Sequence, residues 1–212
     1  GMITAVGARV KIPRQATILD MDGKHIYAGF IESWLDVKTA KKDTSLQAYW
    51  NANMRAYLNG ADLFHPKETG LKELRGLGFT TAHITPKGGI FQGASALVQL
   101  GDTPKILSNS VAQVVEYANG GRGAKEYPTS LLGAIAFIRQ GLIDADWYNK
   151  TKSILAKYPD GNAPIQSDRS LAALAKAKQS KQPFIFRTGN ELYIDRSSNI
   201  ADEFDLNLWI KG

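Results

Sequence analysis

The sequence predicts an α/β fold in which short strands alternate with helices. Three observations support this prediction. The hydrophobic period switches repeatedly between strand-like and helix-like along the 212 residues. The last part of the chain has the pattern strand, helix, strand, which is the order of a parallel βαβ unit. Hydrophobic residues make up 43% of the chain, enough for one sizeable core, so we expect a single main domain with roughly five parallel strands.

The first part of the chain is predicted to be rich in strands. Residues 8–13, 16–21 and 25–34 have the composition of short strands, and the first two contain apolar side chains available for burial: Val10, Ile12, Ile18 and Leu19. A loop rich in polar and aromatic residues follows. Leucines at helical spacing then predict a helix from Pro66 to Leu77, and the β-branched residues of 79–85 predict a buried strand.

The rest of the chain continues the alternation. Residues 94–100 are expected to form a strand, whereas 110–118 fit a strand or a helix equally well, because a short apolar run has no decisive period. Pro128 is expected to open a long helix whose apolar residues recur at intervals of three and four. Beyond it, the pattern predicts an Asp168-capped helix, a strand, a further helix and a final strand, at 169–180, 182–188, 190–205 and 206–212.

Charge and composition exclude several classes of protein. The net charge is +6, but the basic residues are dispersed, and the densest groups, 38–43 and 176–181, fit a solvated surface better than a nucleic-acid site. No apolar run approaches the length that spans a bilayer, so we expect a soluble chain with no membrane partner. The absence of Cys excludes disulfides and thiolate metal sites, but it leaves bacterial cytoplasm and periplasm both open.

Several segments, taken in order, resemble the amidohydrolase superfamily and its imidazolonepropionase-related branch. They are residues 3–33, which include Gly23, Lys24 and the stretch Ala28–Glu32, together with 74–102, 127–148 and 181–212. The resemblance implies a metal-dependent hydrolase on a (β/α)8 barrel, with zinc or another divalent metal in typical members. It divides this chain into a remnant of an N-terminal β-domain, 1–26, and a partial barrel domain, 27–212.

The residues at the positions of the family's metal ligands are not metal ligands here. The His-x-His pair at the end of the first barrel strand falls on Trp34 and Asp36, and a later histidine falls on Arg187. Tryptophan has no lone pair to offer a metal, and arginine is permanently cationic. We therefore expect degenerate metal-ligand positions, no metal or cofactor bound to this chain alone, and no assignable catalytic residue.

The three histidines do not replace the missing ligands. His25 precedes the first barrel strand and fits a surface residue, and His65 precedes Pro66 and fits a helix-capping turn. His83 lies within a predicted strand and could face the interior. It fits a hydrogen-bonded core histidine better than a ligand, because no second ligand stands at metal-binding spacing.

Two short stretches remain as candidates for binding a small molecule. Glu32, Ser33 and Asp36 end a strand and would face the active-site mouth of a barrel, or else lie in solvent. The second stretch contains Lys87, Gly88, Gly89, Gln92 and Ser95. Its backbone N–H groups could close on an anion, or its glycines could supply the φ angles of a tight connection. With His83, these residues are the possible ligand-binding set.

The length of the chain limits the fold and the function. A full (β/α)8 barrel takes about 250 residues, so we expect a partial TIM-like (β/α) barrel or an open parallel sheet with helices, preceded by a small β-segment. The first functional hypothesis is a fragment, inactive alone, of a protein that hydrolyses a C–N bond in an amide or cyclic amide. The alternative is a non-catalytic small-molecule-binding or assembly module derived from the same barrel.

The incomplete barrel also predicts how the chain associates. An open sheet leaves an apolar face without neighbours, so we expect its last two strands to be partly exposed, including Phe184, Ile185, Phe186, Leu208, Trp209 and Ile210. The partner is then a second copy of the chain or a missing C-terminal half of the barrel. The alternative is a sheet that closes into a compact arrangement.

Overall fold

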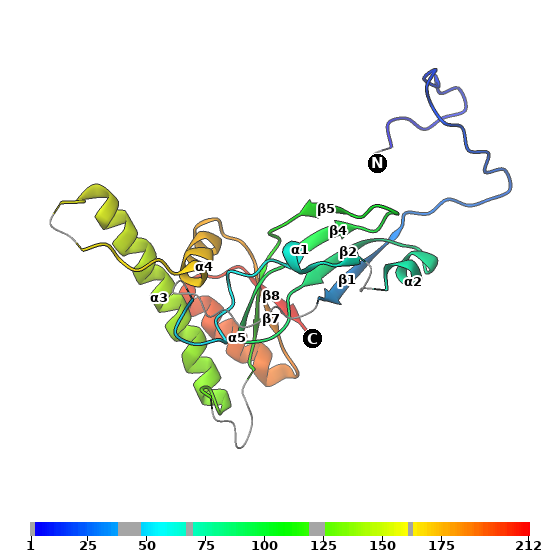
Figure 1. The fold of residues 1–212 in the computed structure, drawn as a ribbon. Helices are drawn as coiled ribbons and strands as arrows, with labels where there is room; N and C mark the ends of the chain where they lie inside the picture. Colours follow the sequence, from blue (N-terminus) through cyan, green and yellow to red (C-terminus); the bar gives the residue numbers. More distant parts are fainter. Residues whose placement is uncertain (1–2, 38–47, 67–69, 119–125, 161–162) are drawn as a thin grey trace.

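The computed structural model describes residues 3–37, 48–66, 70–118, 126–160 and 163–212. It confirms a mixed α/β fold with parallel strands and helices. The strands form two four-stranded sheets instead of one, and a cluster of helices lies beside one of them (Figure 1). We call them sheet A, in the order β1-β2-β4-β5, and sheet B, in the order β3-β6-β7-β8.

Sheet A contains β1 (Phe30–Asp36), β2 (Phe79–Thr85), β4 (Ala96–Gln99) and β5 (Lys105–Ser108). β1 and β2 are parallel, whereas β4 runs antiparallel to both β2 and β5. The short helices α1 (Gly60–Leu63) and α2 (Leu71–Gly76) lie against this sheet. The apolar side chains between them form a small buried cluster: Val37, Leu71, Ala82, Ile84, Ala96, Val98 and Leu100.

Sheet B contains β3 (Phe91–Ala94), β6 (Gln113–Glu116), β7 (Phe184–Arg187) and β8 (Leu208–Lys211). β6, β7 and β8 are parallel, so the predicted βαβ unit at the end of the chain is confirmed. The segment 110–118, ambiguous in the sequence, contains the strand β6. β3 continues directly through Ser95 into β4, so one run of chain belongs to both sheets.

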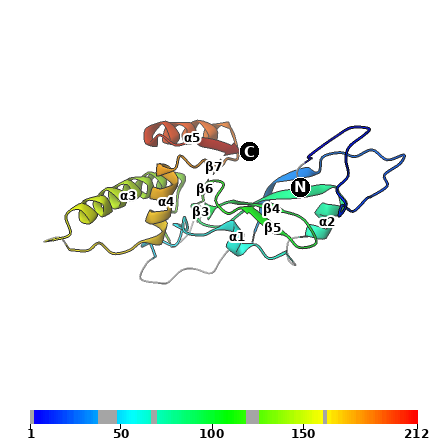
Figure 2. The same cartoon turned by 90° about the horizontal axis from the view of Figure 1, so that it is seen from above.

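Three helices accompany sheet B, and Figure 2 shows α3 and α4 next to each other beside its strands, with α5 on another side. They are α3 (Leu131–Lys157), α4 (Arg169–Gln179) and α5 (Glu191–Phe204). The predicted cap of α4 is confirmed, because Asp168 accepts a hydrogen bond from the Leu171 N–H at 2.9 Å. α3 begins at Leu131, three residues later than the predicted start at Pro128, and the hydroxyl of its cap Ser130 accepts a hydrogen bond from the Gly133 N–H. None of the described helices combines the length and apolarity needed to cross a bilayer.

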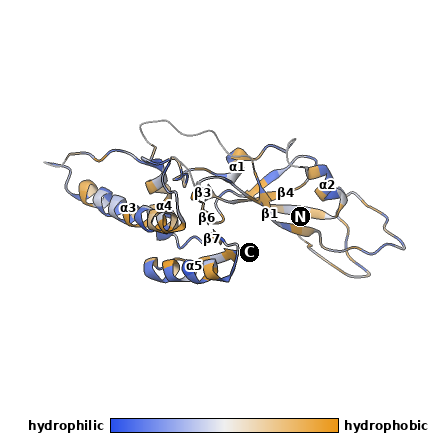
Figure 3. Ribbon diagram, turned by 90° about the horizontal axis from the view of Figure 1, so that it is seen from below, coloured by the Kyte–Doolittle hydropathy of each residue, from blue (hydrophilic) through white to orange (hydrophobic). Residues whose placement is uncertain are grey.

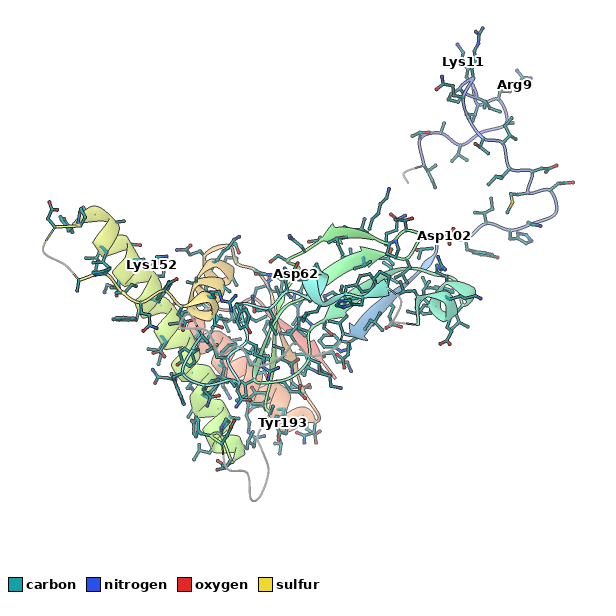
Figure 4. The ribbon with its side chains drawn as sticks, in the orientation of Figure 1. Arg9, Lys11, Asp62, Asp102, Lys152 and Tyr193 are labelled. Atoms are coloured by element: carbon teal, nitrogen blue, oxygen red, sulfur yellow. The ribbon has the colours of Figure 1, made fainter. Side chains whose placement is uncertain are left out.

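The prediction for the N-terminal segment is wrong. Residues 3–29 contain no strand, and Val10, Ile12, Ile18 and Leu19 are all exposed. The segment extends away from the sheets, and its labelled side chains Arg9 and Lys11 lie far from Lys152 on α3 (Figure 4). The apolar pattern was correct for strands, but no neighbouring described strand offers it hydrogen bonds or a surface to cover. The strand predicted at 25–34 begins only at Phe30.

Two further predictions need correction. The helix expected from Pro66 is shortened to Leu71–Gly76, preceded by Gly70 at φ 61°; residues 67–69, like the basic group at 38–43, lie outside the described residues. β7 is not exposed: Phe184, Ile185 and Phe186 are 1%, 4% and 0% exposed. Their strand lies between β6 and β8, and Phe184 and Phe186 join the core under the helices. Exposure is confined to β8, where Trp209 and Ile210 are partly open.

Candidate functional site

The carboxyl ends of strands from both sheets meet at one group of charged side chains. Asp36 ends β1, Thr85 ends β2, Glu116 ends β6 and Arg187 ends β7. Parallel strands deliver the side chains at their carboxyl ends to the same edge, which explains why residues so distant in sequence come together. We call Asp36, Gln92, Glu116 and Arg187 the clasp, because they join sheet A to sheet B.

Asp36 is the most heavily bonded member of the clasp. Its two carboxylate oxygens accept from the two terminal nitrogens of Arg187, each at 3.2 Å. Oδ1 also accepts from the Trp34 indole Nε1–H at 3.0 Å and from the Thr85 hydroxyl at 3.1 Å. The ammonium of Lys87 lies 3.4 Å from Oδ2. These contacts occupy the lone pairs of the carboxylate and fix its orientation.

Arg187 connects Asp36 of sheet A to Gln92 and Glu116 of sheet B. One of its terminal nitrogens donates to Gln92 Oε1 at 3.3 Å, and its Nε lies 3.8 Å from Glu116 Oε2. Gln92 in turn donates to the same Glu116 oxygen at 2.5 Å. A planar guanidinium suits this arrangement because its five N–H groups can address several acceptors at once. The side chain of Arg187 is only 18% exposed, so solvent screens these interactions weakly.

The electrostatics of Asp36 follow from these partners. Burial would by itself raise the pKa of this carboxyl group, but the hydrogen bonds and positive charge of Arg187 oppose that effect. With further hydrogen bonds from Thr85 and Trp34, the pKa of Asp36 is held below its ordinary value. Asp36 is therefore ionised throughout the physiological pH range, and the Asp36–Arg187 pair is a stable ion pair.

Trp34 completes the polar edge with an aromatic face. Its ring lies under two cations, with the Arg187 guanidinium 5.2 Å and the Lys211 ammonium 6.0 Å from the ring centroid. The edge of the ring meets His83 at 89° with centroids 6.1 Å apart. Because the indole N–H already donates to Asp36, Trp34 links the clasp to a second polar group around His83.

The second group consists of Ser33, His83 and Ser95. His83 Nδ1 lies 3.1 Å from the Ser33 carbonyl oxygen, and its Nε2 lies 2.8 Å from the Ser95 hydroxyl. Burial lowers the pKa of His83, so the ring is neutral near pH 7, with Nδ1–H donating to the carbonyl. Ser95 is fully buried and also accepts the Ala112 N–H at 3.1 Å. The pair resembles a Ser–His dyad in distance, but a substrate cannot reach its hydroxyl.

A cavity of about 530 Å³ lies beside these residues, between the two sheets. Sheet A contributes Ser33, Trp34 and His83, and sheet B contributes Ile185, Trp209, Ile210 and Lys211. The volume falls in the range of small-molecule sites. The lining combines an apolar aromatic surface with one cation, which suits a ligand with an apolar body and a negative group.

Three residues of the predicted set take local roles. Glu32 accepts a hydrogen bond from the Trp34 N–H at 3.0 Å, two residues along its own strand. Gly88 and Gly89 have φ angles of 98° and 81°, and a side chain at Gly89 would meet the Asn53 carbonyl oxygen at 2.9 Å. Glycine suits both positions because the backbone has a positive φ angle there, and at Gly89 the Asn53 backbone also approaches closely. Of these three residues, Gly89 contacts the clasp through its backbone oxygen, which accepts a hydrogen bond from the Gln92 side chain at 3.4 Å.

Four residues of the site were not predicted from the sequence as site residues: Thr85, Glu116, Trp209 and Lys211. Thr85, Glu116 and Lys211 each end a strand, so the signal for these three was the strand boundary itself, whereas Trp209 lies inside β8. Glu116 was missed because its segment could not be assigned as a strand. The other two histidines lie elsewhere: His65 Nδ1 bonds to the Leu63 carbonyl at 2.9 Å, and His25 lies in the N-terminal segment.

The residues at this edge do not fit a divalent metal ion. Arg187 and Lys87 direct two positive charges at the carboxylate that a metal would need, and Trp34 donates a hydrogen bond where a ligand must offer a lone pair. Across the part of the chain that the structure describes, no three His, Cys, Asp or Glu side chains are grouped so as to hold a metal. The resemblance implies a metal site, and the residues here contradict it.

Comparison with known proteins identifies the fold. No family model and no curated protein matches the sequence. The structure is similar to the crystal structure of an amidohydrolase from Thermotoga maritima MSB8, with a TM-score of 0.77 and 19% sequence identity. The match covers 97% of this chain and 56% of that chain, so this chain spans about half the length of its structural neighbour. The expected amidohydrolase-like fold is thereby confirmed.

Proposed function

We propose that this chain is part of an amidohydrolase-like protein of the imidazolonepropionase-related branch. The residues at its strand ends form a site that can bind a small molecule but cannot hydrolyse it. The two sheets would derive from a TIM-like barrel, and the parent protein would act on a C–N bond of an amide or cyclic amide. The support for this origin is the shared fold with an amidohydrolase. The support for inactivity is the chemistry of the clasp.

The single observation that carries the proposal is the ion pair between Asp36 and Arg187. Both residues fall on positions where the resemblance implies metal ligands, yet here they satisfy each other. A guanidinium can neutralise and orient a carboxylate as a metal ion does, but it cannot lower the pKa of a bound water or accept an oxygen ligand. The clasp therefore holds the strand ends together, as a metal centre would, but it cannot activate a water molecule for hydrolysis.

The alternative function, binding of a small molecule, is favoured by the cavity between the sheets. Trp34 and Trp209 offer flat apolar surfaces, and Lys211 offers a cation close to Trp34. An aromatic carboxylate matches both features, because its ring can pack on indole and its charge can pair with an ammonium. In this alternative the clasp holds the two walls of the cavity at a fixed separation.

Zinc binding and hydrolysis test the main proposal. The chain is incubated with zinc, dialysed and analysed for metal, then assayed on linear and cyclic amides. We expect far less than one zinc per chain and no hydrolysis above background. The Trp34→His variant should also fail to retain zinc, because Arg187 and Lys87 still oppose a cation. Stoichiometric zinc retained by the unmodified chain would overturn the proposal.

Two further measurements separate the alternatives. Tryptophan fluorescence during titration with benzoate tests the cavity, with neutral benzamide as the matched control; we expect benzoate alone to change the signal and Lys211→Met to abolish the change. Equal responses to the two compounds contradict an anion site. The neighbouring genomic sequence tests the parent enzyme: a downstream reading frame with His, His and Asp at strand ends supports it, and a frame without them supports the binding module.

A further inference from the structure

Helix α3 has two apolar faces, and only one of them is used within the chain. The buried face contains Ala134, Phe137, Ile138, Gly141, Leu142, Ala145 and Tyr148, which pack into the main core. On the opposite side lie exposed apolar residues that the core does not require. Figure 3 shows hydrophobic residues recurring along α3 between hydrophilic ones, and Figure 1 shows the helix at the outer limit of the molecule.

The exposed residues form one straight stripe, defined as Leu132, Ala136, Ile143, Trp147, Ile154 and Tyr158. At about 100° per residue, all six fall within an arc of about 80°. The five large side chains are between 47% and 77% exposed. The spacing repeats every eleven residues, a period close to that of a straight α-helix, so the stripe does not wind around the helix. It extends for about 39 Å at the standard helical rise.

The stripe is symmetric about the level of Ala145. Leu132 and Tyr158 are equally far from this level, as are Ala136 and Ile154, and Ile143 and Trp147. Two antiparallel helices related by a two-fold axis at that level would therefore place apolar side chains opposite one another along the whole stripe. A C2 interface requires this self-complementarity, whereas a different partner or a parallel copy does not.

We propose that the stripe is a homodimer interface in which α3 packs antiparallel against α3 of a second copy. The small side chain of Ala136 faces Ile154 of the second copy, and Ile143 faces its Trp147. Lys150 faces Gln140, whose amide donates to Asp144 at 2.6 Å, so the ammonium lies about one helical turn from a carboxylate. The stripe exposes roughly 600 Å² per copy, which places the dimer at the lower end of stable interfaces, near 1,200 Å² in total.

The oligomeric state and one charged substitution test this interface. In size-exclusion chromatography with light scattering, the full chain should pass from about 23.2 kDa to twice that mass at concentrations on the order of micromolar. Ile143→Glu should weaken association at least tenfold, because it buries a carboxylate opposite Trp147. The matched control is Leu192→Glu, at an aliphatic residue of α5 that is 59% exposed against 50% for Ile143, and it should leave association unchanged. Circular dichroism verifies that both variants are folded.

Cysteine cross-linking tests the direction of the helices, because the natural chain has no Cys. A mixture of Ala136→Cys and Ile154→Cys chains should form a disulfide-linked dimer on mild oxidation. Either variant alone should not, since two like positions lie about 27 Å apart along antiparallel helices. A chain that stays monomeric, a dimer that tolerates Ile143→Glu, or a cross-link between like variants would each overturn the proposal. A dimer that tolerates Ile143→Glu is the result expected if the chain associates through the exposed edge strand β8 instead.

Discussion

Sheets A and B have the same number of strands but very different surroundings. In sheet B, the central strands β6 and β7 are almost entirely buried, and an 18-residue cluster joins them to α3, α4 and α5. In sheet A, β5 is exposed at every residue, and the buried cluster has seven members. The three long helices α3, α4 and α5 pack with sheet B, whereas sheet A has only the short helices α1 and α2 among the described residues. The difference indicates that sheet B is stable by packing, whereas sheet A depends on its attachments to sheet B.

The largest expected effect comes from the core of sheet B. Phe186→Ala should destabilise the chain by about 3 to 5 kcal/mol, because it removes a fully buried ring and leaves a cavity. Phe79→Ala in β2 is the control from sheet A, where the ring is only partly buried, and should cost roughly half as much. Urea denaturation gives both values. Equal losses of stability would show that the cores of the two sheets contribute alike to folding.

A smaller effect is expected at the clasp. Arg187→Gln should cost about 2 to 3 kcal/mol, because it leaves the carboxylates of Asp36 and Glu116 without their shared cation. Adding Asp36→Asn should recover part of this loss, since the uncompensated charge is then removed. The control is Arg139→Gln, which breaks an exposed ion pair with Glu203 and should cost less than about 1 kcal/mol. If the two arginine substitutions reduce the free energy of unfolding equally, the clasp does not stabilise the contact between the two sheets.

The smallest expected effect is a pH dependence in acid. The pKa of Asp36 is lowered in the folded chain, so its stabilising contribution is complete above its ordinary pKa of 3.8 and is lost as the pH falls through the folded value. The difference in stability between the natural chain and Asp36→Asn should therefore shrink below about pH 4. His83 is present in both chains, and its contribution largely cancels in this difference. If this stability difference instead grows as the pH falls, the pKa of Asp36 is raised in the folded chain and not lowered.

The sequence predicted local features well where a single segment contains all the information. The period of three and four residues predicted α3, and Asp168 was correctly placed as the cap of α4. The strand-end position of Asp36 also made it a candidate binding residue, and the structure places it in the clasp. Its partnership with Arg187 was not predictable, because 151 residues separate them and the contact depends on how two sheets face each other.

The failed predictions share a physical cause. Val10 and Ile18 have the pattern of strand residues, yet a strand requires a neighbour, and the pattern does not say whether one exists. The burial of β7 was missed for the opposite reason, since three helices and two strands from elsewhere in the chain surround it. Periodicity reports which face of an element could be buried, and tertiary structure decides whether it is.

The run of chain from Phe91 to Gln99 passes from sheet B to sheet A without a break. At the crossing, Ser95 is fixed on both sides of its backbone, with its N–H donating to Ala112 and its carbonyl accepting from Val111. Because β3 of sheet B precedes β4 and β5 of sheet A along the chain, no single cut leaves one intact sheet in each piece. A gene split between Ala94 and Ala96 would leave sheet A without β4 and β5 in one fragment and sheet B without β3 in the other, so recovery of the fold would require both fragments to be expressed together.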